Sequence, residues 1–231
     1  MIRANCRNRF TAADFDFVVK SLGKSSRDAV SLSELLTEED ARDTILDHKT
    51  LVDSILSQPS HLAISPQFYF YVLTRHVLKQ SGIDDRRLAD YVASLLETFS
   101  HTARMQSPVD RQEGPIQYLC DMMLALRTAT PEQTFFIRAH VGNYSLFITG
   151  IFHENIARRS RRGAPDCSFY EEAGRSNFKI AADHQVARSA ELSDVYDALG
   201  ARFHDIRLAL NHLSDRLLTL DDASASNILL A

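Results

Sequence analysis

Apolar residues recur at three- and four-residue steps through most of the chain, which is the spacing of one face of an α-helix. No segment alternates apolar and polar residues at a period of two for long enough to predict a strand. The pattern therefore predicts an all-α fold, a bundle of seven to eight mostly antiparallel helices. Helix-capping residues, Gly and Pro divide the chain into these expected helices: about 12–22, 38–58, 66–81, 85–99, 116–127, 131–162, 169–189 and 192–220.

The two longest expected helices differ in pattern. The central one, about 131–162, starts at a Thr130/Gln133 capping box and ends before Gly163. The C-terminal one has a heptad-like apolar stripe: Leu192, Tyr196, Leu199, Phe203, Ile206, Leu210, Leu213, Leu217 and Leu220. Residues beside this stripe lack the complementary charges of a coiled coil. We therefore expect it to pack inside its own fold, with dimerisation through it as the alternative.

Composition supports long helices in a globular protein. The 231 residues include only 8 Gly and 6 Pro, and 45% are hydrophobic against 24% charged. This length suits one domain over 1–231. The polar loop 104–114 leaves open a sub-division into 1–103 and 115–222.

Charge and cysteine content indicate the compartment and the partners. The net charge of −4 gives no overall attraction to nucleic acid or to an anionic membrane. Three distant cysteines form no CxxC pair, and no apolar stretch reaches the roughly 20 residues of a spanning helix. No secretory signal opens the chain. The expectation is a cytoplasmic protein with reduced thiols and no membrane partner.

Motifs for metals and cofactors are missing. No two of the nine histidines lie three or four residues apart, the spacing at which two side chains on one helix could reach the same ion. The sequence also lacks a Gly-rich phosphate loop and a G-x-S-x-G elbow. We therefore expect no metal site and no cofactor, and whether the chain is an enzyme stays open.

Polar residues on the central helix suggest a ligand pocket. His140, Asn143 and Tyr144 lie among apolar residues, and the next helix could supply partners from Glu171, Arg175 and His184. Such a group forms either a ligand pocket or a satisfied core network that fixes helix register. Gly142 and Gly150 on the same helix indicate close approach of a neighbouring helix or of a ligand.

One dense run of positive charge comprises Arg158, Arg159, Arg161 and Arg162. It complements the dipole at the C-terminal end of the central helix, and arginines also bind phosphate. The segment 34–53 is acidic, with seven acidic residues against Arg42 and Lys49. The two regions could meet within one chain or between subunits.

Three functional hypotheses follow. The first is a cytoplasmic helical protein-interaction or regulatory protein that self-associates or binds another protein. The second is a small-molecule-binding or enzymatic bundle with a polar pocket on the central helix. The third, less favoured, is nucleotide or nucleic-acid binding through the four arginines.

Overall fold

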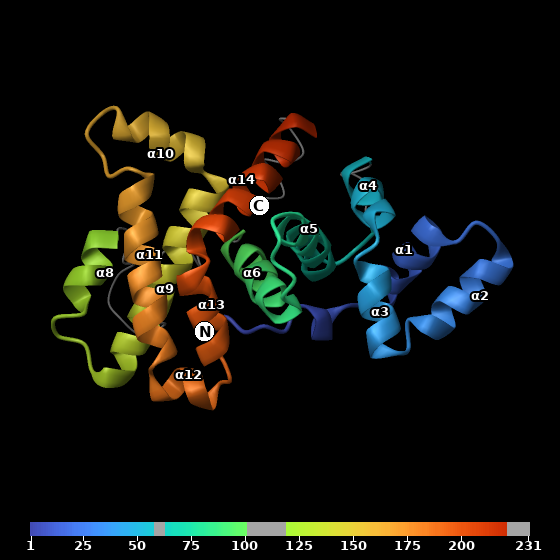
Figure 1. Ribbon diagram of the computed structural model, residues 1–231, viewed down its shortest axis with the longest axis horizontal. Helices are drawn as coiled ribbons and strands as arrows, with labels where there is room; N and C mark the ends of the chain where they lie inside the picture. The colour runs from blue at the N-terminus through green and yellow to red at the C-terminus, as the bar shows by residue number, and fades with distance from the viewer. Residues whose placement is uncertain (58–62, 101–118, 221–231) are drawn as a thin grey trace.

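The computed structural model describes residues 1–57, 63–100 and 119–220, and all regular structure in these segments is helical (Figure 1). The predicted all-α class is thereby confirmed for this part of the chain. The loop 104–114, about which a sub-division was considered, lies outside it. Within the described segments no helix is both long and apolar enough to cross a membrane.

A 3-10 turn, η1 (Arg7–Arg9), precedes the α-helices. The helices of the described residues are α1 (Ala12–Leu22), α2 (Ser26–Leu35), α3 (Glu39–Leu46), α4 (Lys49–Ser57), α5 (Pro66–Gln80), α6 (Arg86–Phe99), α8 (Leu119–Ala125), α9 (Pro131–Ile151), α10 (His153–Ser160), α11 (Cys167–Ala182), α12 (Gln185–Ser189), α13 (Ser193–Ala201) and α14 (Phe203–Leu220).

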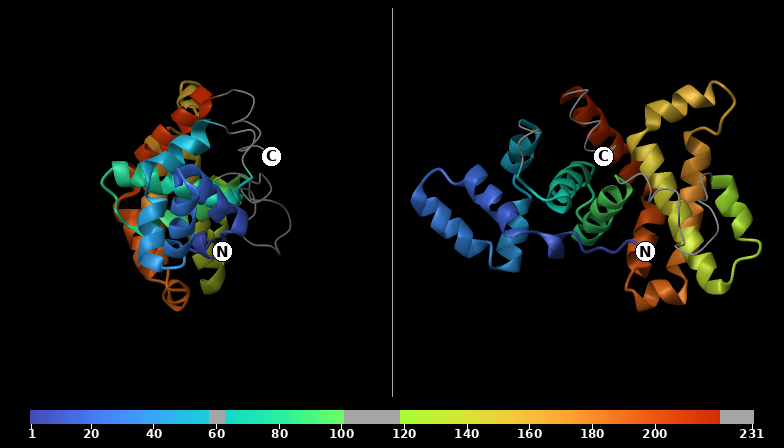
Figure 2. Two further views of the ribbon diagram at one scale, coloured as in Figure 1. Left: turned by 90° about the vertical axis from the view of Figure 1, so that its right-hand side faces the viewer. Right: turned by 180° about the vertical axis from the view of Figure 1, so that it is seen from behind.

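The helices form an elongated molecule. Helices α1–α4 lie at one end of its long axis, and α8 and α10 lie at the other (Figures 1 and 2). Between them α5 packs against α6, while α11 packs against α9 and α13. Helix α14 contacts both α9 and α5, so it connects the two halves. The predicted antiparallel order stays a prediction.

Several helix starts follow the capping residues in the sequence. Thr11 and Thr130 open α1 and α9 with complete capping boxes, and Asp85 caps α6. Ser65 caps α5, and its backbone N–H and hydroxyl also donate to the buried Asp14 carboxylate of α1, at 2.6 and 2.8 Å. One carboxylate therefore fixes the starts of two helices that are far apart in sequence.

The predicted number of helices is too low. Four segments expected to be continuous are each interrupted, at Asp47–His48, Phe152, Asp183–His184 and Arg202. None of these breaks contains Gly or Pro, the residues from which helix ends were predicted. Helix α2 was also missed. The described residues consequently form thirteen α-helices rather than seven or eight.

The expected central helix over 131–162 is wrong, because the chain turns at Phe152. Asn211 of α14 donates its side-chain N–H groups to the carbonyls of Thr149 and Gly150, at 2.7 and 2.8 Å. Ser214 donates to the carbonyl of Ile151 at 2.8 Å. Since α14 satisfies these last carbonyls of α9, the helix can end without leaving them unpaired.

The apolar stripe of the C-terminal segment lies inside the fold, although Arg202 divides it between α13 and α14. Every stripe residue from Leu192 to Leu217 is buried, and the side chain of Leu220 is outside the described set. These residues therefore pack within their own chain, as expected, and their side chains are not accessible on its surface.

Gly142 and Gly150 mark close helix contacts. A Cβ at Gly142 would lie 2.7 Å from ring atoms of Phe178 on α11, and one at Gly150 would lie 2.8 Å from Cβ of Leu210 on α14. The neighbouring-helix interpretation of both glycines is confirmed, because each contact is tighter than a side chain allows.

An ion cluster joins the end of α3 to α5 and α6. Asp47 accepts both bonds of a bidentate pair from the buried Arg75, at 2.8 and 2.9 Å, and further bonds from Lys79 and Arg86. Burial raises the pKa of Asp47, but the hydrogen bonds and charges of these cations outweigh it and lower the pKa to about 2. Asp43 forms a second ion pair, in which both of its carboxylate oxygens accept from Nη1 of Arg7.

Acid should weaken this cluster in a defined pH window. Because the pKa of Asp47 is lower in the folded state, its contribution is complete above pH 4, near the carboxyl pKa of the unfolded chain, and is lost as pH falls toward 2. We expect this loss to be about 2 kcal/mol. Asp47→Asn should lower the free energy of unfolding at neutral pH by about 2–3 kcal/mol, since it leaves the buried Arg75 with Asp84 as its one remaining carboxylate partner among the described residues.

Urea unfolding at a series of pH values measures this effect, with exposed Asp16→Asn as the control. An Asp47→Asn variant that keeps the stability and acid sensitivity of the unaltered protein would contradict the assignment.

Gly150→Ala tests the contact between α9 and α14. Alanine ordinarily stabilises a helix interior by about 1 kcal/mol relative to glycine. Here the added methyl group meets Leu210, so we expect a loss of about 1–3 kcal/mol instead. Thermal and urea unfolding measure the sign. Asn155→Ala, at an exposed position of α10, is the control and should be neutral or slightly stabilising.

Candidate functional site

His140 and Asn143 of α9 are buried, Tyr144 is partly buried, and Asn143 is hydrogen-bonded within the core. The Tyr91 hydroxyl donates to Asn143 Oδ1 at 2.9 Å and lies 3.5 Å from the Tyr196 hydroxyl. Complete burial raises the pKa of Tyr91 well above its usual value, so the phenol stays protonated and can donate. Phe135 and Phe178 lie against the Tyr196 ring. This part of α9 therefore forms a hydrogen-bonded group inside an aromatic core.

The other pocket candidates lie in several different groups. His140 stacks on Tyr144, with ring centroids 6.4 Å apart, and also contacts Phe99. His184 caps α12 by accepting from the Val186 backbone N–H, and it stacks on Phe135. Helix α9 thus carries His140 and Tyr144 in one group, whereas Asn143 and His184 border the aromatic cluster around Phe135.

Glu171 and Arg175 have other neighbours. Glu171 pairs with His204 and Arg207 of α14, at 3.1 and 3.0 Å. Arg207 also donates to Asn211 Oδ1 at 3.0 Å, and Asn211 holds the last carbonyls of α9. The result is a polar chain from α11 through α14 to the end of α9. Arg175 lies 3.9 Å from Glu172 on its own helix.

Sequence reasoning missed Arg207 and Asn211. Their spacing of four residues places them on one face of α14, but the residues they bind come from α9 and α11, which no local motif indicates. Ser168 and Glu171 have the spacing of a capping box, but they do not cap α11. Asp166 caps α11 by accepting from the Phe169 N–H at 3.0 Å, which leaves Glu171 to pair with α14.

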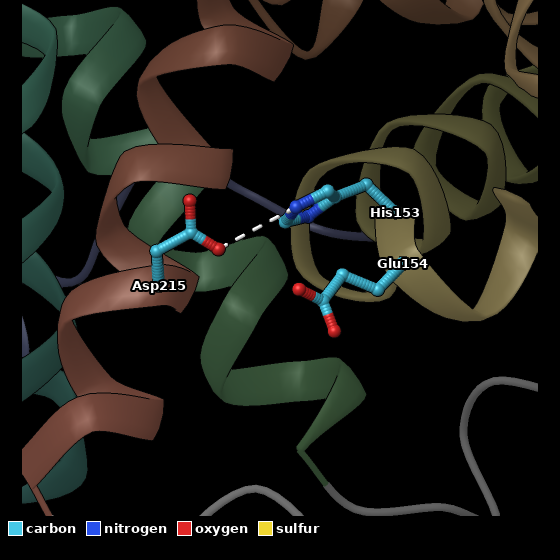
Figure 3. Close-up of side chains that lie close together, drawn as sticks. All are labelled: His153, Glu154 and Asp215. Carbon is cyan, nitrogen blue, oxygen red and sulfur yellow. Dashed lines mark ion pairs between the residues drawn. The ribbon is translucent and has the colours of Figure 1, made fainter.

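His153, Glu154 and Asp215 come together where α10 begins beside α14 (Figure 3). His153 Nε2 lies 3.4 Å from an Asp215 carboxylate oxygen, and the possible ligand atoms of all three residues lie within 4.8 Å of one another. One imidazole and two carboxylates could hold a divalent cation. Two of the three side chains are exposed, however, and exposed acidic groups often lie together without a metal. The ion pair of His153 with Asp215 joins α10 to α14.

The four arginines of the basic run are all exposed and lie on α10 and the turn after it. Within the described residues none of them makes an ion pair or a side-chain hydrogen bond. Gly163 follows with a φ of 88°, the left-handed conformation expected of a glycine that ends a helix. The side chains Arg158, Arg159, Arg161 and Arg162 thus remain available at one end of the molecule.

The acidic segment divides into paired and unpaired residues. Asp43 and Asp47 are bound in the ion cluster described above. Glu34, Glu38, Glu39 and Asp40 are exposed on α2, α3 and the link between them, at the end of the molecule opposite α10 (Figure 1). The acidic segment and the arginine run therefore do not meet within one chain.

Exposed apolar side chains accompany both charged regions. Val30 and Leu35 of α2 are 61% and 46% exposed beside the acidic residues. Phe169 is 45% exposed in the first turn of α11, just after the arginine run.

Comparison of the chain with protein-family models, curated proteins and solved structures finds no match.

Tyr91→Phe tests whether the core group around Asn143 is structural. The substitution removes the only hydroxyl that donates to Asn143 Oδ1 among the described contacts, and an unpaired buried acceptor costs about 1–3 kcal/mol. Urea unfolding should show this loss. The double variant Tyr91→Phe/Asn143→Leu should recover much of it, because both polar partners are then replaced by apolar groups. A double variant that is less stable by the sum of both losses would contradict this pairing.

Proposed function

We propose that this protein is a helical interaction protein that self-associates head to tail. The basic end (Arg158, Arg159, Arg161, Arg162 and Phe169) of one copy would contact the acidic end (Val30, Glu34, Leu35, Glu38, Glu39 and Asp40) of the next. The observation that carries the proposal is the position of these two exposed sets at opposite ends of one elongated chain.

Each end combines exposed apolar side chains with charged ones. Apolar side chains provide area that loses water on contact, and a charged rim supplies orientation and specificity. Val30 and Leu35 serve this purpose at the acidic end, as Phe169 does at the basic end. Arginine forms bidentate pairs with carboxylates, which suits four guanidinium groups facing four acidic residues.

The position of the two ends determines the form of assembly. An interface between two different patches is heterologous, so each added copy exposes the same two patches again. Such contacts produce a ring if the rotation closes and an open chain if it does not. Ionic strength should control the assembly, since exposed charges are screened over roughly 8–10 Å at physiological salt.

Charge reversal at each end tests the interface. One variant replaces the four arginines of the basic end with Glu, and a second replaces the four acidic residues of the acidic end with Lys. In each variant alone both ends carry the same charge, so they repel each other. We therefore expect self-association to weaken by at least about tenfold, equivalent to about 1.4 kcal/mol. An equimolar mixture should assemble again, because each variant then meets a partner of opposite charge.

Sedimentation velocity over a range of protein concentrations, at low and high salt, provides the measurement. Lys179→Glu/Arg188→Glu is the control, since both residues are exposed on α11 and α12 away from the two ends. A native chain that stays monomeric at every concentration in low salt would overturn the proposal. Loss of RNA or DNA binding with the arginine variant, without any change in self-association, would instead assign the basic end to nucleic acid.

A further inference from the structure

A cleft separates the N-terminal segment from the turn between α12 and α13. Its volume is about 610 Å³, within the range of roughly 300–1,000 Å³ that is usual for small-molecule sites. Three parts of the chain that are far apart in sequence form its walls. Its polar and charged side chains are Arg3, Asn5, Asn8, Arg87, Ser189 and Glu191.

The wall formed by the N-terminal segment carries polar side chains that have no partner among the described residues. The side chains of Arg3, Asn5 and Asn8 make no hydrogen bond or ion pair with any other residue in the described segments. Arg87, from the first turn of α6, reaches the opposite wall, where it donates to the backbone carbonyl of Glu191. Arg87 also lies 3.7 Å from the Glu191 carboxylate. The cleft therefore contains two guanidinium groups, two amides and one carboxylate.

Glu191 has an unusual backbone conformation. Its φ of 55° is the only positive φ of a non-glycine residue in the described part of the chain. The Leu192 N–H donates to the Ala187 carbonyl at 2.8 Å, which closes α12 in the way that ordinarily places glycine at position 191. A residue with a Cβ is strained there, and such strain is concentrated at functional sites.

The fold does not explain why this position carries a glutamate. The Glu191 side chain is 84% exposed, and a pair between exposed charges contributes little to stability. The hydrogen bond from Arg87 uses the backbone carbonyl, which a glycine would also supply. What glutamate adds is a carboxylate at the edge of the cleft.

We propose that this cleft binds a small zwitterion of the amino-acid class. Arg3, together with the amides of Asn5 and Asn8, binds the ligand's carboxylate, and Glu191 binds its ammonium group. The two arginines against one glutamate favour a ligand with one negative charge more than positive, such as an acidic amino acid.

Isothermal titration with two probes tests this assignment. L-glutamate carries two carboxylates and an ammonium group, whereas glutarate has the two carboxylates alone. We expect glutamate to bind at least tenfold more tightly than glutarate, a difference of about 1.4 kcal/mol. Arg3→Ala should weaken both probes at least tenfold, and Arg27→Ala on α2, exposed and outside the cleft, should leave both unchanged.

Two variants of Glu191 separate charge from strain. Glu191→Gln keeps the strained backbone and removes the charge, while Glu191→Gly removes both. Both variants should abolish the preference for glutamate over glutarate, and only Glu191→Gly should raise Tm. Failure of both probes to bind would overturn the proposal, as would equal affinity of the two probes for the native protein or an unchanged glutamate preference in both variants.

Discussion

The course of the second half of the chain depends on the hydrogen bonds that side chains of α14 donate to the last carbonyls of α9. Asn211 and Ser214 bind three consecutive carbonyls of α9, and Gly150 lets the two helices come close enough for these bonds to form. Those donors replace the backbone N–H groups that a continued helix would have supplied to the same carbonyls. The turn at Phe152 then sets the direction of α10, so the position of the exposed arginines is a consequence of hydrogen bonds made by a helix that follows about 50 residues later in the sequence.

The separation of charge along the molecule has a similar origin. The acidic residues of the segment 34–53 are continuous in sequence but not in their contacts. Asp43 and Asp47 form ion pairs that attach α3 to the N-terminal turn and to α5. Only the acidic residues that find no cation inside the fold stay on the surface. The basic run has no corresponding partners in the described residues. The ion cluster that binds Asp43 and Asp47, and the absence of a described partner for the four arginines, therefore decide which of these charges stay unpaired on the surface.

Sequence patterns were informative where the determining contacts are local. Thr11, Ser65, Asp85 and Thr130 cap helices within three residues of themselves, and all four starts were predicted. The burial of Asn143 and the close contacts at Gly142 and Gly150 were also foreseeable, because a polar group or a glycine amid apolar residues needs a tertiary reason. The breaks at Phe152 and Arg202 were not, since neither position contains a helix breaker. For the same reason Glu191 gave no signal: its backbone angle follows from how α12 closes, and no neighbouring residue indicates it.

Helix contacts at glycine hold four helices in close packing. Gly142, Gly150, Gly174 and Gly200 all lie inside helices and all face another helix at a distance that leaves no space for a methyl group. Glycine at such positions loses helix propensity, so the close packing has to supply the compensating stability. The four contacts join α9, α11, α13 and α14. Such packing resists relative movement of these four helices, which form the half of the molecule away from α1–α4 (Figure 1).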